Sequence, residues 1–257
     1  MTTATPARPP AAAPKPSTLT YTRYELLRAL RNVRFFIFSL VFPFLLYLLI
    51  VGPNRHVKID GAPFPLYYMT GLLAWGTMTA VMAGGARIAL ERSIGWNRQM
   101  RVTPLSTRAY FGTKIATGYL VALASIVLLY GAGIGFGVHL SASHWVTMTV
   151  MVLIGLVPFA AIGVLLGHLL SPDSMGPAMG GITAIFALLG GSWGPIASGG
   201  FLRHLTELLP SYWLVQAGKT SLGDAFWPAK AWIVLAVWTL VFSRLAVRAW
   251  QRDTQRA

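Results

Sequence analysis

ERSIGWNRQMRVTPLSTRAYFGTK, residues 91–114, is a strongly basic stretch between two hydrophobic runs, and the rest of the chain is organised around it. Its single acid is Glu91. Its five cations are Arg92, Arg98, Arg101, Arg108 and Lys114. The first half contains no proline before Thr103-Pro104. This pattern predicts a short helix on a membrane surface that ends where the proline turns the chain.

The composition is that of a membrane protein. Of the 257 residues, 55% are hydrophobic and 11% are charged, whereas a soluble domain has about 25% charged residues. A net charge of +14 would favour nucleic acid as a partner of a soluble protein. In a membrane protein the same excess marks cytoplasmic loops, so no nucleic-acid partner is expected. The absence of cysteine excludes disulfides, thiol catalysis and Cys-ligated metals.

The N-terminal region divides into two parts. Residues 1–16 are rich in Ala, Pro and Thr, and we expect them to be disordered. Residues 17–34 alternate apolar and basic side chains at helical spacing, and Thr22 with Glu25 fits a capping box. The pattern predicts an amphipathic helix in the cytoplasmic interface, whose arginines face anionic lipid. A plain solvated lead-in is the alternative.

An all-α membrane protein with six transmembrane helices is predicted for residues 35–250, followed by a cytosolic tail, 251–257. The interrupted segment 194–230 is expected to form two short helices broken at Pro210, on or in the outer leaflet. The last span crosses if Arg244 snorkels to the inner interface. The expected spans are 35–52, 66–86, 115–137, 145–170, 175–193 and 231–248.

The distribution of positive charge predicts the orientation. With six spans both termini lie on one side. Of the 21 Lys and Arg residues, 16 then fall inside and five outside. The five outside are Arg55, Lys58, Arg203, Lys219 and Lys230. This asymmetry predicts a multi-pass protein of the cell membrane with both termini cytoplasmic.

Few residues suggest chemistry. No acid lies well inside a predicted span, which argues against an ion-coupled transporter. His168 is expected to be structural, with a relay role as the alternative. His139 and His144 share an outer turn without other ligands, so no metal site is expected. Gly218-Lys219-Thr220 resembles the end of a Walker A loop, but Trp213 occupies the position of its required glycine.

Glycines and aromatic residues have mainly structural interpretations. The spacings Gly163 to Gly167 and Gly176 to Gly180 allow close helix packing. Ser192 could be a protease nucleophile with His168 or His204 as base, but no third group is evident. Most aromatic residues are expected to anchor the chain at the interfaces. Three that fall within spans are candidates for a substrate path: Tyr68, Trp75 and Phe186.

With this order of segments, the chain resembles the membrane permease subunit of bacterial ABC-2 type ABC transporters. The resemblance covers nearly everything after Ser17. Met100 and Val102 depart mildly from positions where leucine is common. The most specific part is the signature E-[KR]-x-x-G, L-x-x-T-P-x-S, G-x-K, which matches Glu91 to Gly95, the stretch ending Thr103-Pro104-Leu105-Ser106, and Gly112 to Lys114.

A second match concerns the segment between the fifth and sixth spans. Residues 190–195 and 208–213 are similar to the outer re-entrant segment of the family. The resemblance therefore assigns Gly191, Trp193, Pro195 and Pro210 to such a segment.

The resemblance implies an export complex of two permease chains, identical or merely similar, and two separate ABC ATPase subunits. ATP and magnesium would bind to those subunits, so no cofactor, metal or catalytic residue is expected here. The helix after span two would be the coupling helix, which docks in the ATPase. Thr103 and Pro104 would end it. Contacts would come from Glu91, Arg92, Gly95, Trp96 and Arg98.

The expected function is export of an amphipathic compound. A drug or antibiotic is preferred over a polysaccharide or lipid-linked glycan, because the chain is short and has no additional carbohydrate-type domain. An intramembrane hydrolase built on Ser192 is a remote alternative, and a channel or structural membrane protein is another.

Overall fold

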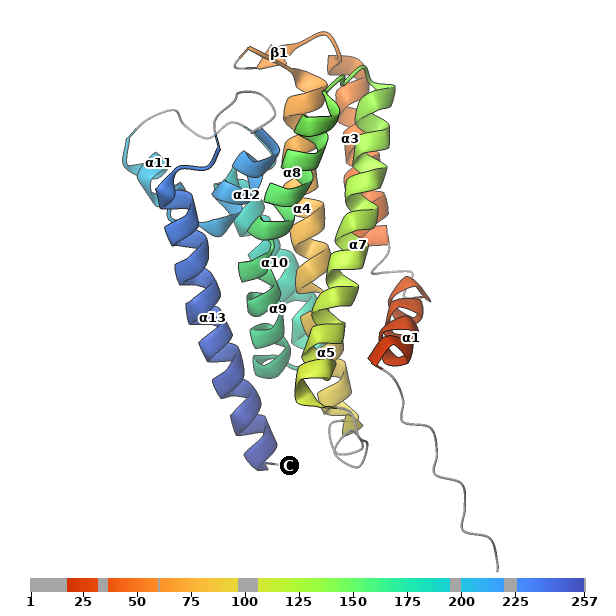
Figure 1. Ribbon diagram of the computed structural model, residues 1–257, viewed down its shortest axis with the longest axis vertical. Helices are drawn as coiled ribbons and strands as arrows, with labels where there is room; N and C mark the ends of the chain where they lie inside the picture. Colours follow the sequence, from red (N-terminus) through yellow and green to blue (C-terminus); the bar gives the residue numbers. More distant parts are fainter. Residues whose placement is uncertain are drawn as a thin grey trace, which may run out of the picture.

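The computed structural model describes residues 18–31, 37–59, 61–96, 106–194, 200–219 and 226–256. The described part is helical apart from one short antiparallel hairpin, which pairs Lys58 with Pro63 and Ile59 with Ala62 (Figure 1). The elements are α1 (Thr18–Arg31), η1, a π-helical turn (Ile37–Val41), α3 (Phe42–Asn54), β1 (Lys58–Ile59), β2 (Ala62–Pro63), α4 (Phe64–Met82), α5 (Gly84–Ser93), α7 (Thr107–Gly135), α8 (Ala142–Gly155), α9 (Val157–Leu169), α10 (Pro172–Gly190), α11 (Phe201–Thr206), α12 (Pro210–Lys219) and α13 (Ala229–Arg256).

Three of the described helices are long and apolar enough to cross a hydrocarbon core of about 30 Å. They are α7, the α8–α9 pair over Ala142–Leu169, and α13 over Ala229–Asp253. A shorter apolar helix covers Ser39–Asn54. These helices confirm an α-helical protein suited to a membrane. The count of six spans and the cytoplasmic position of both termini stay predictions.

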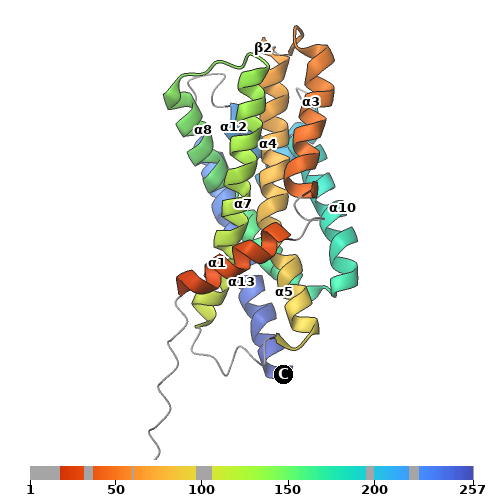
Figure 2. The same ribbon diagram turned by 90° about the vertical axis from the view of Figure 1, so that its right-hand side faces the viewer.

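The bundle has two distinct ends. The β hairpin lies at the upper end in Figure 1, whereas α5 and the C-terminus lie at the lower end. Figure 2 shows α1 running crosswise over the lower part of the bundle, in front of α7 and α5. The basic stretch of residues 91–114 therefore begins at the lower end, in the last turn of α5.

The central helix is α4, which packs against α3, α7, α9, α10 and α12. Its apolar residues occupy every face, and nearly all of its side chains are buried. A helix that is apolar all round is stable only when other helices enclose it. The core of the protein is therefore built around α4.

Glycines bring α9 against the junction of α4 and α5. A Cβ atom added to Gly85 would lie 1.8 Å from the carbonyl oxygen of Gly163, and one added to Gly167 would lie 2.5 Å from the carbonyl oxygen of Gly85. The packing role predicted for Gly163 and Gly167 is thus confirmed. The pair Gly176 and Gly180 differs, because no atom of the described chain lies within 4 Å of either Cβ position.

Two local predictions concern the lower part of the bundle. The helix expected from Glu91 towards Thr103 is interrupted after Ser93 by a turn that places Gly95 at a φ of 71°. Trp96 is helical again, and residues 97–105, with the predicted end at Thr103-Pro104, lie outside the described residues. The prediction that Thr22 and Glu25 begin a helix is wrong. They lie inside α1, which starts at Thr18, and Glu25 is buried.

Two other predictions concern helix limits. The last apolar helix extends from Ala229 to Arg256, well beyond the expected 231–248. The two short helices expected around Pro210 are confirmed as α11 and α12, the second of which begins at Pro210. Their position relative to a bilayer stays a prediction.

Candidate functional site

A buried ion cluster joins three helices at the lower end of the bundle. The ammonium group of Lys114, on α7, lies 2.6 Å from Oε1 of Glu25 on α1 and 2.5 Å from Oε1 of Glu91 on α5. Lys114 and Glu91 are each only 1% exposed. We call Glu25, Lys114 and Glu91, with the partners described next, the α1–α5–α7 cluster.

The partners of the two carboxylates surround this centre. Arg87 contacts Glu25 at 3.4 Å, and Arg28 contacts Glu91 at 3.2 Å. The Tyr110 hydroxyl donates a hydrogen bond to the second oxygen of Glu91, at 2.5 Å. Burying a charge costs several kcal/mol unless it is paired, and here each buried charge has two or more partners. The cluster therefore holds α1, α5 and α7 in one relative position.

Helical spacing explains how each element contributes to the cluster. Arg87 and Glu91 are four residues apart on α5, as are Tyr110 and Lys114 on α7, so each pair lies on one helix face. Thr22 occupies the turn of α1 before Glu25, and its hydroxyl lies 3.1 Å from that of Thr113. The cluster thus extends along α1 as a polar stripe.

Tyr21 borders the cluster on α1. Burial first, and then the Glu91 and Glu25 carboxylates, raise the pKa of its phenol. Its hydroxyl is buried and has no hydrogen-bond partner among the described residues. A phenol is already neutral at physiological pH, and the raised pKa favours that neutral form further, so Tyr21 adds no third negative charge beside the two glutamates.

A second ion cluster connects α5 to α9 and α13. Arg92 binds Asp253 through two atoms, at 2.8 Å from Nε and 3.1 Å from Nη2. Asp253 also contacts Nδ1 of His168 at 2.7 Å. Arg92 further donates to the carbonyl oxygen of Gly167 at 2.9 Å. We call Arg92, Asp253 and His168 the α5–α9–α13 cluster, and it gives His168 the structural role that was expected.

The residues expected to contact an ATPase fall into three groups. Glu91 and Arg92 face inward. Because the Glu91 carboxylate is only 1% exposed, it offers no surface for the direct contact with the ATPase that was expected of it. Gly95 lies in the turn that follows α5, and Trp96 comes directly after that turn in a helical conformation. The other three lie outside the described residues: Arg98, Thr103 and Pro104.

A model of the family described as ABC-2 family transporter protein matches residues 63–248. The chain belongs to the ABC-2 transporter family. It is also 28% identical over 192 residues to a Bacillus subtilis (strain 168) protein named "Putative transport permease YvfS", a match that covers 73% of this chain and 78% of that protein. Family membership supports a transmembrane permease in a membrane, and it implies an ABC ATPase as partner.

The family match covers much of both clusters of this ABC-2 permease. It includes Glu91, Lys114 and His168, whereas Glu25 and Asp253 lie outside the matched residues. Sequence reasoning named Lys114 only within a motif, treated Glu25 as a helix cap and missed Asp253. A signal was available, because the chain has only seven acids and three of them lie in these clusters.

The three substrate-path candidates of the permease lie in separate aromatic groups. Tyr68 stacks on Phe64, with ring centroids 5.5 Å apart. Trp75 contacts Phe42 at 5.7 Å and Trp193 at 5.5 Å. Phe186 sits between Phe159 and Trp238, at 5.4 and 5.9 Å. Tyr68 and Phe186 are 8% exposed, so their rings pack inside this chain.

The predicted re-entrant residues of the permease are partly described. Gly191 ends α10 at a φ of 77°, a conformation that favours glycine. The chain then passes so close to α4 that a Cβ atom on Gly71 would lie 2.1 Å from the carbonyl oxygen of Ser192. Trp193 packs edge-on against Trp75, and Pro210 is buried at the start of α12. Pro195 lies outside the described residues.

The arrangement does not support the hydrolase alternative. His168 is near the start of α10 and Ser192 follows its end, so the 19 residues of α10 separate them by about 28 Å at 1.5 Å per residue. His204 is exposed on α11. Within the described ranges, no three side chains of the metal-binding types gather into a group that could hold an ion.

Proposed function

We propose that this chain is the membrane subunit of an ATP-driven exporter that moves an amphipathic, drug-like or antibiotic-like compound out of the cell. Two permease chains, identical or similar, work with two separate ABC ATPase subunits, which bind the ATP and magnesium. Both termini of the chain are cytoplasmic, so the lower end in Figure 1 faces the ATPase.

The observation that carries this proposal is the position of the α1–α5–α7 cluster. The chain between α5 and α7 runs from the end of α5 at Ser93 to the start of α7 at Thr107. Glu91 lies two residues before the end of α5, and Lys114 lies seven residues after the start of α7. A partner that displaces this segment therefore pulls on two helices whose ends are joined by a buried ion pair.

The second cluster extends the same connection. Arg92 is adjacent to Glu91 in the chain but binds Asp253 on α13 and the carbonyl end of α9. Consecutive residues of α5 thus hold α1 and α7 on one side and α9 and α13 on the other. Closure of the ATPase would move these helices as one body between two arrangements.

In this proposal the segment between α5 and α7 binds the ATPase, while Glu91 and Arg92 transmit its motion. Gly95, Trp96 and Arg98 supply contacts, and Thr103-Pro104 ends the segment. This division assigns different failures to different residues. Loss of a contact residue should release the ATPase, whereas loss of an ion-cluster residue should leave it bound but uncoupled.

Co-purification tests the contact half of the proposal. The chain is purified with its ATPase as wild type and as Arg98→Glu, with Arg55→Glu at the opposite end of the bundle as the matched control. We expect the ATPase to be lost from Arg98→Glu and retained by the control. Equal retention by all three proteins would contradict the proposed docking segment.

Export of a polysaccharide or lipid-linked glycan is the second candidate substrate class. Transport of labelled compounds of both classes into inverted vesicles, with and without ATP, decides between them. ATP-dependent uptake of the glycan alone would overturn our choice.

A further inference from the structure

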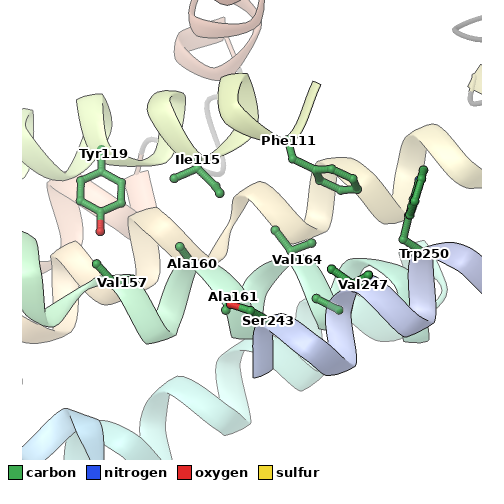
Figure 3. A pocket seen from close by; sticks show the side chains of 11 residues that line it. Phe111, Ile115, Tyr119, Val157, Ala160, Ala161, Val164, Ser243, Val247 and Trp250 are labelled. Atoms are coloured by element: carbon green, nitrogen blue, oxygen red, sulfur yellow. The ribbon is translucent and has the colours of Figure 1, made fainter. Parts of the chain in front are cut away.

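An apolar groove of ≈ 440 Å³ lies between α7, α9 and α13. Figure 3 shows Tyr119 near one end of it and Phe111 with Trp250 near the other, with Ile115 and Val164 between them. From Phe111 to Tyr119 the groove follows α7 for about 12 Å, at 1.5 Å per residue. Its volume falls in the range of small-molecule sites, roughly 300–1,000 Å³.

The lining indicates a hydrocarbon ligand. Almost every side chain in it is apolar, and the hydroxyls come from Tyr119 and Ser243. The Tyr119 hydroxyl is already engaged, since it donates to the carbonyl oxygen of Leu153 at 3.1 Å. At the lower end, the Phe111 ring packs edge-on against Trp250 at 6.1 Å. Such walls give shape and apolar contact but little hydrogen bonding.

The groove is open to the surroundings of the bundle. Val157 and Val247 line it and are 42% and 51% exposed. In the most apolar stretch of α13, only 17% of the residues are buried. Because the chain belongs to a membrane transporter family, these exposed apolar faces meet lipid tails. An occupant can therefore enter sideways from the bilayer.

Positive charge borders the lower end of the groove. Arg108 is exposed and precedes Phe111 by one turn on the same face of α7. Arg248 and Arg252 are exposed on the same part of α13 as Val247 and Trp250. None of these three arginines forms an ion pair with an acid in the described ranges. An anionic group at this end would complement them.

We propose that the groove binds one acyl chain of an anionic phospholipid, with the phosphate of the headgroup at Arg108. The apolar walls select a hydrocarbon chain, and the arginines select a negative headgroup over a zwitterionic one. This site lies on the outer face of α7, α9 and α13 and contains no residue of either ion cluster, although its Phe111 ring packs edge-on against His168 at 5.8 Å. The proposal therefore does not rest on the proposed coupling role.

Photo-crosslinking tests the proposal. The full-length chain in detergent micelles is exposed to phosphatidylglycerol that carries a photoactivatable group in its acyl chain, and labelled peptides are mapped by mass spectrometry. Phosphatidylcholine with the same chain is the comparison lipid. We expect phosphatidylglycerol to label α7, α9 and α13 at the groove and to outcompete phosphatidylcholine there.

Two pairs of variants locate the site. Ala161→Phe fills the groove and should remove most of this labelling, whereas Ala116→Phe, at an exposed position next to Ile115 on α7, should not. Arg108→Gln should weaken phosphatidylglycerol binding about fivefold, since one cation near anionic lipid contributes about 1 kcal/mol. Arg23→Gln on α1 should leave it unchanged.

Three results would overturn the proposal. They are labelling spread evenly around the bundle, equal labelling by phosphatidylcholine, and labelling that both alanine variants reduce alike. Displacement of the lipid from the groove by a transported compound at lower concentration would assign the groove to the cargo instead. If Ala161→Phe loses its thermal unfolding transition, competition of unlabelled phosphatidylglycerol with the probe on wild type decides the matter.

Discussion

Lys114→Met removes the centre of the α1–α5–α7 cluster and should both destabilise the protein and uncouple it. In the wild type, the ammonium group lies within 2.6 Å of a carboxylate oxygen of Glu25 and of Glu91. Without it, the two buried carboxylates keep Arg87 at 3.4 Å, Arg28 at 3.2 Å and the neutral Tyr110 hydroxyl at 2.5 Å. Because the Arg28 side chain is 49% exposed, its contact compensates for little.

Breaking one partner of a buried ion pair costs about 3–5 kcal/mol, because an unpaired charge remains in the interior. We expect a loss of this size in the free energy of unfolding in detergent. Lys230→Met is the matched control, because Lys230 pairs with Glu207 at the surface. Its loss should be at most about 1 kcal/mol.

A charge-balanced variant separates stability from coupling. Glu91→Gln and Lys114→Met together remove one buried charge of each sign and leave Glu25 paired with Arg87, and replacing a buried ion pair by neutral groups is often nearly neutral in stability. We expect this double variant to recover most of the unfolding free energy and to retain the ATPase. Its ATP hydrolysis should continue while export in proteoliposomes falls, because the contacts that Lys114 makes from α7 to α1 and α5 are gone.

Two outcomes would refute this reasoning. Unchanged stability of Lys114→Met would mean that water replaces the ammonium group and that the cluster is not buried in solution. Wild-type export by the double variant, with ATP hydrolysis and export still in step, would mean that the Lys114 ion pairs are not needed to transmit the motion.

Three further predictions concern other parts of the chain. Gly85→Ala should cost about 1–3 kcal/mol in thermal unfolding, because its Cβ has no room against α9, whereas Gly176→Ala should be tolerated. A hydrogen bond from Lys230 lowers the pKa of Glu207 below 4.5. The contribution of the ionised Glu207 to the free energy of unfolding is therefore present above pH 4.5 and is lost as the pH falls through the lowered pKa. Glu207→Gln and wild type should then converge in stability in acid. Asp253→Asn should detach the end of α13 and speed tryptic cleavage there, and an unchanged cleavage rate would contradict the role of the second cluster.

Much of the helical pattern could be predicted from local sequence. The apolar runs predicted the long helices, and Pro210 predicted the break between α11 and α12 because proline removes a backbone donor. The prediction failed where one residue changes the backbone direction. Gly95 was interpreted as part of a motif, yet its positive φ belongs to the turn that ends α5, the helix that contains Glu91.

The candidate site was less predictable. Glu91 was selected correctly as a special residue, since it is the only acid in a basic stretch. The direction of its side chain could not be inferred, because helical periodicity is weak in a segment that mixes charge with apolar residues. Burial of Glu91 instead depends on α1, which lies crosswise over α5 and α7.

The sequence by itself determined that this is an α-helical membrane protein with a basic segment after its second apolar run, and the motif in that segment carries the resemblance to the ABC-2 family. The helices and the membrane class depend on composition and on neighbours within a few residues. Only the tertiary structure decided that Glu25 and Lys114, 89 positions apart, and Arg92 and Asp253, 161 positions apart, are partners. A charged side chain reaches only a few ångströms, so its partner is set by how the helices pack.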